Sequence, residues 1–269
     1  MFTLPSKPKI TNKKDNWANF EIEGLYPGYG VTVGNSLRRV LLSSLEGAAI
    51  TQVKIKGISH EFSTIPGVLE DVIIIITSLK QMRFKFFSDE PQKAFLKIKG
   101  EKEVKGSDFE FPSQVELVNK SCHIATLTEK KAELEMEIQI EKGIGYEPAD
   151  RRKKNQKQEI GAIAIDAIFT PIKRVSYKIE NMRVGERTDY DRLSLEIETD
   201  ATVEPEDAFF NACEILVKHF SLIEEPFAPK AATGERKNEP KEAGASEIKE
   251  RKLEAKKAAK KPKKSKNKL

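Results

Sequence analysis

Apolar and polar residues alternate along much of the chain in short stretches separated by turn residues, which is the pattern of antiparallel strands. Two such stretches come early, "NWANFEIEG" and "YGVTVG", joined by a turn around Pro27 and Gly28. Later ones are "AAITQVKIKGI", "KAFLKIKG", "SQVELVN", "HIATLT", "AELEMEIQIEKG", "IGAIAIDAIFTPIKRVSYKIE" and "RLSLEIETD". The pattern predicts mainly antiparallel sheet, interrupted at residues 146–158 by a polar basic stretch typical of a mobile surface loop.

Helical signals occur in three places. The first predicted helix follows the early glycines, where Asn35 or Ser36 can cap its start and Gly47 can end it in a left-handed conformation. The run "EDVIIIITSLKQM" (residues 70–82) is ambiguous, because four consecutive Ile favour a strand while its apolar residues also fit helical spacing. The last helix begins around Pro205, which suits a first turn and has acidic neighbours that favour a helix N-terminus.

The last helix has a wider apolar surface than packing against one sheet requires. Between residues 208 and 223 the apolar residues are Ala208, Phe209, Phe210, Ala212, Cys213, Ile215, Leu216, Val217, Phe220, Leu222 and Ile223. Such width indicates a second contact surface, often another subunit, or alternatively a helix buried within its own domain. Composition alone weighs these two interpretations equally.

Three early glycines raise the question of phosphate binding. Gly28, Gly30 and Gly34 have the spacing G-x-G-x-x-x-G, which is one residue longer than the dinucleotide fingerprint. No Gly-Lys-Ser or Gly-Lys-Thr follows, so the Walker pattern also fails. The spacing therefore predicts a structural turn before a helix rather than a nucleotide site.

Two adjacent arginines on the first helix face different ways. Its apolar arc on a helical wheel consists of Leu37, Val40, Leu41, Leu42 and Leu45. Arg38 falls inside this arc, which predicts a stem packed on apolar surface and a head paired with a carboxylate. Arg39 points to the opposite side, where its planar guanidinium suits a carboxylate on a partner protein; the alternative is a solvated surface charge.

The charge is distributed unevenly along the 269 residues. Of the 47 Lys and Arg and the 42 Asp and Glu in the chain, residues 228–269 hold 15 and 6, and this segment has no aromatic residue. Such a composition cannot build a core, which predicts a disordered Lys-rich tail behind a mildly acidic body.

The cysteines and the N-terminus bear on the compartment in which the protein is located, and the cysteines indicate a reducing one. Cys122 and Cys213 are too few for a disulfide framework and too isolated for a zinc site. The N-terminus lacks the apolar core of a signal peptide, and no apolar run approaches the ~20 residues needed to span a bilayer. We expect a cytoplasmic protein without a membrane contact.

No residue pattern predicts catalysis. His60, His123 and His219 are scattered, without a second ligand at metal spacing, and no arrangement of Ser, His and an acid can be argued. The acids of "DYD" at residues 189–191 are more typical of a turn than of a metal site. We therefore expect no catalytic residue, no metal and no cofactor.

Long ordered stretches resemble the alpha subunits of bacterial-type DNA-directed RNA polymerase. They are "GYGVTVGNSLRRVLLSSLEGAAITQVKIKGISHEFSTIPGVLEDV" (residues 28–72), "GIGYEPADRR" (143–152) and "FTPIKRVSYKIENMRVGERTDYDRLSLEIETDATVEPEDAFFNACEILVKHF" (169–220). The resemblance implies an α+β fold with two subdomains. Residues 1–47 with 169–225 would form a helical dimerisation subdomain, and residues 48–168 an inserted, mostly antiparallel one. It also implies that residues 70–82 are helical.

The resemblance also implies a function. The chain would be a non-catalytic subunit of DNA-directed RNA polymerase, a nucleotidyltransferase complex, and its homodimer would be the platform for the two largest subunits, beta and beta-prime. Nucleotidyl transfer would belong to those partners, and DNA contact would be indirect. A nucleoid-associated location in a bacterium would follow, and the sequence leaves a plastid source open.

The resemblance also implies which residues of this chain contact other chains. For partner subunits these are Arg39, supported by Arg38, Gly34 and Asn35, and in the second protomer Arg183, Arg187 and Asp189. An internal turn-stabilising pair is an equal alternative for Arg187 and Asp189. The implied dimer interface consists of Leu37, Val40, Leu41, Leu45, Phe209, Cys213, Leu216 and Phe220.

The chain departs from the family pattern in two respects. Typical members continue into a small helical C-terminal domain that binds promoter DNA, whereas residues 228–269 predict no such domain. This basic tail could contact nucleic-acid phosphates without sequence preference, or only solubilise the chain. Within the body, Ala201 stands where relatives commonly have glycine, and Phe209 and Phe210 stand where charged residues are frequent.

Overall fold

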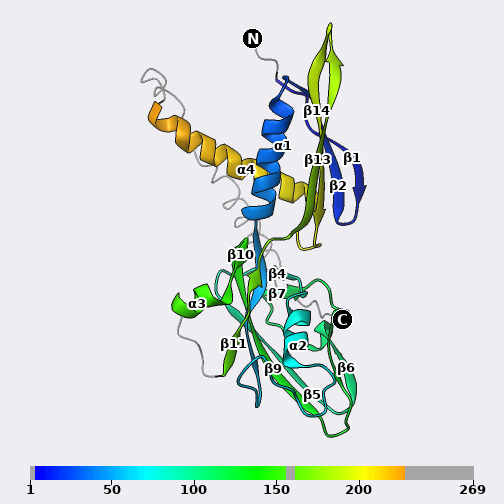
Figure 1. The fold of residues 1–269 in the computed structure, drawn as a ribbon, viewed down its shortest axis with the longest axis vertical. Coiled ribbons are helices and arrows are strands. Elements are labelled where there is room, and N and C mark those ends of the chain that lie inside the picture. Colours follow the sequence, from blue (N-terminus) through cyan, green and yellow to red (C-terminus); the bar gives the residue numbers. More distant parts are fainter. Residues whose placement is uncertain (1–3, 156–160, 228–269) are drawn as a thin grey trace, which may run out of the picture. The chain divides into compact units, whose positions relative to one another are not determined.

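The computed structural model describes residues 4–155 and 161–227, and it combines helices with antiparallel sheets, as predicted (Figure 1). The chain divides into two compact units, Met1–Phe220 and Ser221–Leu269. Of the second unit, the described part is the end of helix α4 (Pro205–Glu224) and the 3₁₀ turn η2 (Glu225–Phe227). The predicted Lys-rich tail lies outside the described residues.

One four-stranded antiparallel sheet joins segments from the two ends of the first unit. Its order is β1 (Lys9–Lys14), β2 (Trp17–Leu25), β14 (Arg187–Thr199) and β13 (Ile172–Val184). Helix α1 (Tyr29–Ser43) packs on β13 and β14 (Figure 1). The core between the sheet and the helices α1 and α4 consists of Ala18, Phe20, Leu37, Leu41, Leu45, Ile172, Leu195, Ile197, Ala208 and Ala212.

A second four-stranded antiparallel sheet lies in the middle of the sequence, in the order β11, β3, β9 and β5. The strands are β11 (Ala162–Ala164), β3 (Glu46–Ile55), β9 (Glu133–Ile144) and β5 (Gln92–Lys99). Three strand pairs accompany it: β4 (Phe84–Phe86) with β7 (Val115–Leu117), β6 (Lys102–Lys105) with β8 (His123–Leu127), and β10 (Tyr146–Glu147) with β12 (Ala167–Ile168). A 3₁₀ turn, η1 (Gly106–Asp108), follows β6.

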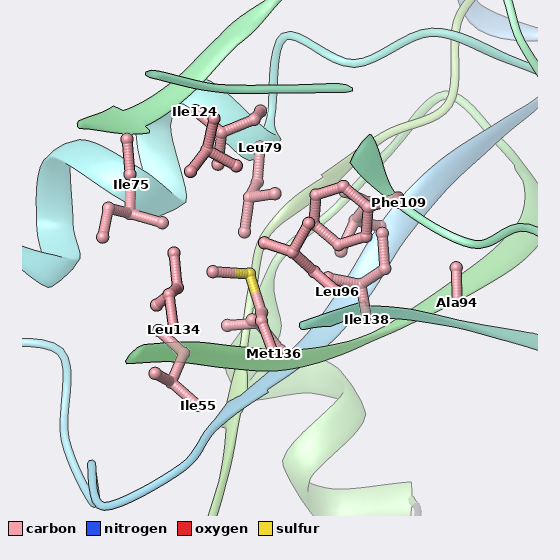
Figure 2. Packing of buried hydrophobic residues seen from close by; sticks show 14 of the residues in the cluster. Ile55, Ile75, Leu79, Ala94, Leu96, Phe109, Ile124, Leu134, Met136 and Ile138 are labelled. Carbon is pink, nitrogen blue, oxygen red and sulfur yellow. The ribbon is translucent and has the colours of Figure 1, made fainter. Parts of the chain in front are cut away.

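The ambiguous run at residues 70–82 contains helix α2 (Val72–Leu79), so the helical interpretation is confirmed. Ile75 and Leu79 are buried, whereas Ile73 and Ile74 are exposed, which is the outcome of helical spacing. Figure 2 shows the α2 side chains packed with those of β9, and both belong to one cluster of buried residues. Burial of one helical face has outweighed the strand propensity of four consecutive Ile.

The start of α1 was predicted wrongly. The helix begins at Tyr29, within the stretch "YGVTVG" predicted as a strand, and Gly28 precedes it at φ +85°. Gly30 and Gly34 therefore lie inside the helix. A Cβ on Gly30 would come within 2.9 Å of the Asp191 Oδ2 atom, and one on Gly34 within 2.9 Å of the Leu193 Cδ1 atom. These glycines let α1 approach the sheet closely, which overrides their low helix propensity.

The end of α1 was also predicted wrongly. The helix stops at Ser43, and the N–H of Ser44 donates to the carbonyl of Val40 at 2.9 Å. Gly47 lies in β3 opposite Gly143, without a left-handed conformation. Its lack of a side chain is explained by packing, because a Cβ there would lie 1.9 Å from the carbonyl oxygen of Phe169.

The stretch at residues 146–158 is partly regular, contrary to the loop prediction. It contains β10 and helix α3 (Ala149–Asn155), and residues 156–160 lie outside the described part. The N–H of Ala149 donates to the Asp166 carboxylate at 2.9 Å, which satisfies one free donor at the start of α3. A carboxylate 17 residues away thus supports a helix that local composition did not indicate.

Candidate assembly surface

The start of α1 is held by a buried carboxylate from β14. The Oδ2 atom of Asp191, which is 6% exposed, accepts the N–H of Gly28 at 2.9 Å and the N–H of Gly30 at 3.0 Å. A negative charge at this end also complements the helix dipole. The donors that a phosphate would need are therefore already bonded, which agrees with the expectation of a structural glycine turn.

The two arginines of α1 differ in exposure. Arg38 is half-buried and Arg39 is exposed. The Arg38 guanidinium donates to the Asn35 side-chain oxygen at 3.2 Å, and its Nε atom is buried without a hydrogen-bond partner among the described residues. The predicted carboxylate partner of Arg38 is therefore wrong within the described part of the chain: the partner is a neutral amide one helical turn away.

Arg39 lies on the outward face of α1, where the helical wheel predicted it. Its backbone carbonyl accepts the hydroxyl of Ser43 at 2.7 Å, one turn further along the helix. Within residues 4–155 and 161–227, no acidic side chain forms an ion pair with Arg39. An exposed guanidinium of this kind keeps its fork of donors free for a carboxylate from another chain.

A second polar cluster lies at the tip of the β13–β14 hairpin. Arg187 forms a bidentate pair with Asp189, at 3.0 Å and 2.6 Å. Its guanidinium also lies over the rings of Tyr26 and Tyr190, 5.5 Å and 5.4 Å from their centroids. The internal pair is therefore present, and it holds the hairpin tip against the segment that leads into α1.

The electrostatics keep this pair ionised. The hydrogen bonds from Arg187 lower the pKa of the Asp189 carboxyl below its usual value, and the Asp189 carboxylate raises the pKa of the Arg187 guanidinium above its usual value.

Arg183 lies on the other strand of the hairpin and is exposed; its Nε atom donates to the carbonyl of Gly185 at 2.8 Å. All three predicted residues of this region thus have accessible side chains.

The predicted dimer residues fall into three environments. Leu37, Leu41 and Leu45 are buried in the core of the same chain, and Val40, Phe209, Cys213 and Leu216 are partly buried against that core. Phe209 stacks on Phe20 with ring centroids 4.6 Å apart. Phe220 is 63% exposed, and the side chains of Phe210 and Val217 on the same helix are exposed to a similar extent. The accessible apolar surface of α4 is therefore formed mostly by residues that the resemblance did not name.

The three histidines take part in separate local contacts. His60 bonds the Ser63 hydroxyl at 3.0 Å, His123 bonds Glu70 at 3.0 Å, and the His219 ring bonds the Ile215 carbonyl at 2.8 Å. No group of three His, Cys, Asp or Glu residues in the described ranges could hold a metal ion. In the same part of the chain, no helix is long and apolar enough to span a membrane.

Sequence reasoning missed Asp191 and Tyr26. Asp191 belongs to "DYD", where the acids were interpreted as turn residues, and Tyr26 had no role. The strand register places Asp191 opposite Leu25, just before the glycines that start α1. The period of the strand could have identified Asp191, because it turns this acidic side chain inward, next to the glycine turn at the start of α1.

Comparison with known proteins identifies the family. The family described as the RNA polymerase Rpb3/RpoA insert domain matches residues 53–170. The DNA-directed RNA polymerase subunit alpha of Syntrophomonas wolfei is 46% identical over 223 residues, which cover 81% of this chain and 70% of that protein. The corresponding subunit of Symbiobacterium thermophilum is 48% identical over 221 residues, with 81% and 70% covered. The chain belongs to the family of DNA-directed RNA polymerase alpha subunits.

This membership confirms the resemblance found in the sequence, including the α+β fold. The alpha subunit of Roseiflexus sp. (strain RS-1) is 46% identical over 217 residues, 81% of this chain. The aligned part spans 66% of the length of that relative. The chain is therefore a homologue of proteins named as alpha subunits of DNA-directed RNA polymerase.

Proposed function

We propose that this alpha-family chain is a non-catalytic subunit of a DNA-directed RNA polymerase that homodimerises and forms the platform for the beta and beta-prime subunits. The observation that carries the proposal is the identity of 46–48% with alpha subunits over about four-fifths of the chain. Nucleotidyl transfer would belong to the complex and its largest subunits, so DNA contact by this chain is indirect. A cytoplasmic location, nucleoid-associated within the polymerase, is part of the proposal.

The dimer contact is proposed for the apolar surface of α4 and the adjoining face of α1. Phe210, Val217 and Phe220 are each more than 60% exposed on α4, although a helix packed only within its own domain would cover them. Leu37, Leu41 and Leu45 support this surface from the core beneath. Two copies related by a two-fold axis could bury these faces against each other.

The partner contacts are proposed for Arg39 and for the β13–β14 hairpin. Arg39 is exposed, and Arg38, Gly34 and Asn35 position it, because Gly34 sets the closeness of α1 to the sheet and Asn35 fixes the Arg38 head. Arg183, Arg187 and Asp189 offer both charges at the hairpin tip. The proposed subdomains are residues 1–47 with 169–225 and residues 48–168, and any nucleic-acid contact by the tail at 228–269 lies outside the described residues.

The Arg39→Ala variant tests the partner contact. We expect weaker capture of purified beta and beta-prime subunits with an unchanged dimer mass, because Arg39 points away from the apolar core of α1. Arg174→Ala is the matched control, since Arg174 is an exposed arginine of β13 that pairs with Glu198 at 3.4 Å. A dimer that dissociates in Arg39→Ala, or capture equal to the control, would contradict the placement.

A further inference from the structure

The chain crosses twice between the two proposed subdomains, and both crossings lie at one place. The first crossing is at Gly47, in β3, and the second is at residues 168–171, between β12 and β13. A Cβ on Gly47 would be 1.9 Å from the carbonyl oxygen of Phe169, so the two crossings lie side by side. Two chain segments that cross together have the geometry of a hinge, because they restrain the angle between the joined parts only weakly.

A groove of about 980 Å³ separates β4 from α4 beside these crossings. Phe84 and Phe86 of β4 line it, and so do Asp207 and Asn211 of α4. Close packing is what fixes the relative position of two elements. Since β4 and α4 have a groove between them, their packing does not by itself fix the angle between the proposed subdomains.

An ion pair bridges the proposed subdomains next to this groove. The Nε atom of Arg83, which precedes β4, lies 3.2 Å from the Oδ2 atom of Asp200, which follows β14. Their chain neighbours Phe84 and Ala201 line the groove. The Arg83 side chain is 28% exposed and that of Asp200 is 5% exposed. The pair is thus largely shielded from water, where the attraction between two charges is stronger than at an open surface.

Each partner of the pair is fixed within its own subdomain. The Arg83 guanidinium donates to the carbonyl of Lys80, at the end of α2, at 2.8 Å. The Oδ1 atom of Asp200 accepts the N–H of Thr202 at 3.0 Å, and the N–H of Asp200 donates to the carbonyl of Pro171 at 2.9 Å. The pair therefore joins the end of α2 to the turn that leads into α4.

We propose that the pair of Arg83 with Asp200 is a latch that sets the angle between the inserted β-rich subdomain and the subdomain that carries α4. While the latch is closed, the two parts move as one body. Without it, they are joined by the hinge at Gly47 and residues 168–171. A buried ion pair often adds little net stability, but it favours one arrangement over others, because only that arrangement pairs both charges. The latch lies within a single chain, so the inference does not depend on the proposed subunit contacts.

Pulsed electron paramagnetic resonance tests the latch, because it measures the distribution of distances between the two subdomains. Spin labels are attached at Glu116→Cys of β7 and Lys173→Cys of β13, both exposed positions, in the full chain with Cys122→Ala and Cys213→Ala. An excess of unlabelled chain ensures that each dimer carries one labelled copy. Asp200→Asn should at least roughly double the width of the distribution, because hinge motions exceed the fluctuations within a packed unit.

Arg83→Met is the second variant, since it removes the other charge and leaves Asp200 bonded to Thr202. It should broaden the distribution to the same extent, and it decides the question even where Asp200→Asn disturbs the turn before α4. Arg174→Met is the control: Arg174 pairs with Glu198 at 3.4 Å within one sheet, so its loss should leave the width unchanged. A distribution in Arg83→Met as narrow as in the wild type would overturn the inference, and so would equal broadening in the control.

Discussion

Asp191 shows how one side chain can fix the position of a functional helix. Its buried carboxylate accepts two N–H groups at the start of α1, across 163 and 161 residues of sequence. The helix carries both Arg38 and Arg39, so the start of α1 determines where these arginines lie. Neither helix propensity nor the glycine spacing could reveal this contact, because it depends on the register of a distant strand.

Asp191→Ala should therefore lower the free energy of unfolding by about 1–3 kcal/mol, because it leaves buried helix N–H groups without an acceptor. Denaturant titration measures this loss. Asp191→Asn, which keeps an acceptor oxygen, should lose less. Equal stability of the Ala variant and the wild type would show that the two hydrogen bonds do not hold the helix.

Ala201 is the single non-glycine residue with positive φ, at +75°, in the described part of the chain. A Cβ in this region costs roughly 1–2 kcal/mol, so glycine is the residue that would fit this backbone conformation best. Ala201→Gly should raise the melting temperature by a few degrees, since relief of strain exceeds the added entropy of the unfolded chain. Ala48→Gly, in β3, should lower it instead; a lower melting temperature for Ala201→Gly would refute the strain argument.

At the scale of elements, the alternating pattern and the last helix could be predicted, whereas the boundaries of α1 could not. Alternation follows directly from a sheet with one buried face, so the strands of the sheet formed by β11, β3, β9 and β5 were visible in the sequence. A glycine, in contrast, can end a helix or allow close packing. Gly30, Gly34 and Gly47 all serve packing, and only the partners across the fold distinguish the two roles.

Gly47→Ala tests the packing role. The added methyl group would lie 1.9 Å from a backbone oxygen that cannot rotate away, so the strand must shift. We expect a loss of roughly 3 kcal/mol or more in unfolding free energy, measured by denaturant titration. A small loss, below about 1 kcal/mol, would show that β3 moves easily at this point.

The strand β9 carries a pH-sensitive ion pair network. Glu135 binds Lys56 of the loop after β3 at 2.7 Å and also pairs with Lys97 of β5. The hydrogen bonds from these lysines lower the pKa of Glu135 to about 2. Because the folded pKa is depressed, the network stabilises the fold above the unfolded value of 4.5 and is lost as pH falls from there towards 2.

The Glu135→Gln variant should therefore show a smaller loss of stability than the wild type between pH 5 and pH 3, and a lower stability at pH 7. The denaturant midpoint as a function of pH measures both effects. Glu116→Gln, which changes an exposed residue of β7, is the control and should follow the wild-type curve. Parallel curves for Glu135→Gln and the wild type would contradict the role of the network.

At the scale of the whole molecule, the sequence identified the family, because ordered matches in both halves of the chain carried the resemblance. The wide apolar surface of the last helix also pointed beyond a single chain, and Phe210, Val217 and Phe220 are indeed exposed. The pairing of β10 with β12 could not be predicted, because it joins Tyr146, at the start of a stretch interpreted as a loop, to Ile168, which lies 22 positions later in a stretch interpreted as a strand.

The central claim is that a dimer of this chain assembles the two largest polymerase subunits. Native mass spectrometry of the purified chain mixed with purified beta and beta-prime subunits, after nuclease treatment, tests it most directly. The account predicts one complex that contains two copies of this chain, one beta and one beta-prime. A complex with a single copy of the chain, or one that forms only while nucleic acid is present, would contradict it.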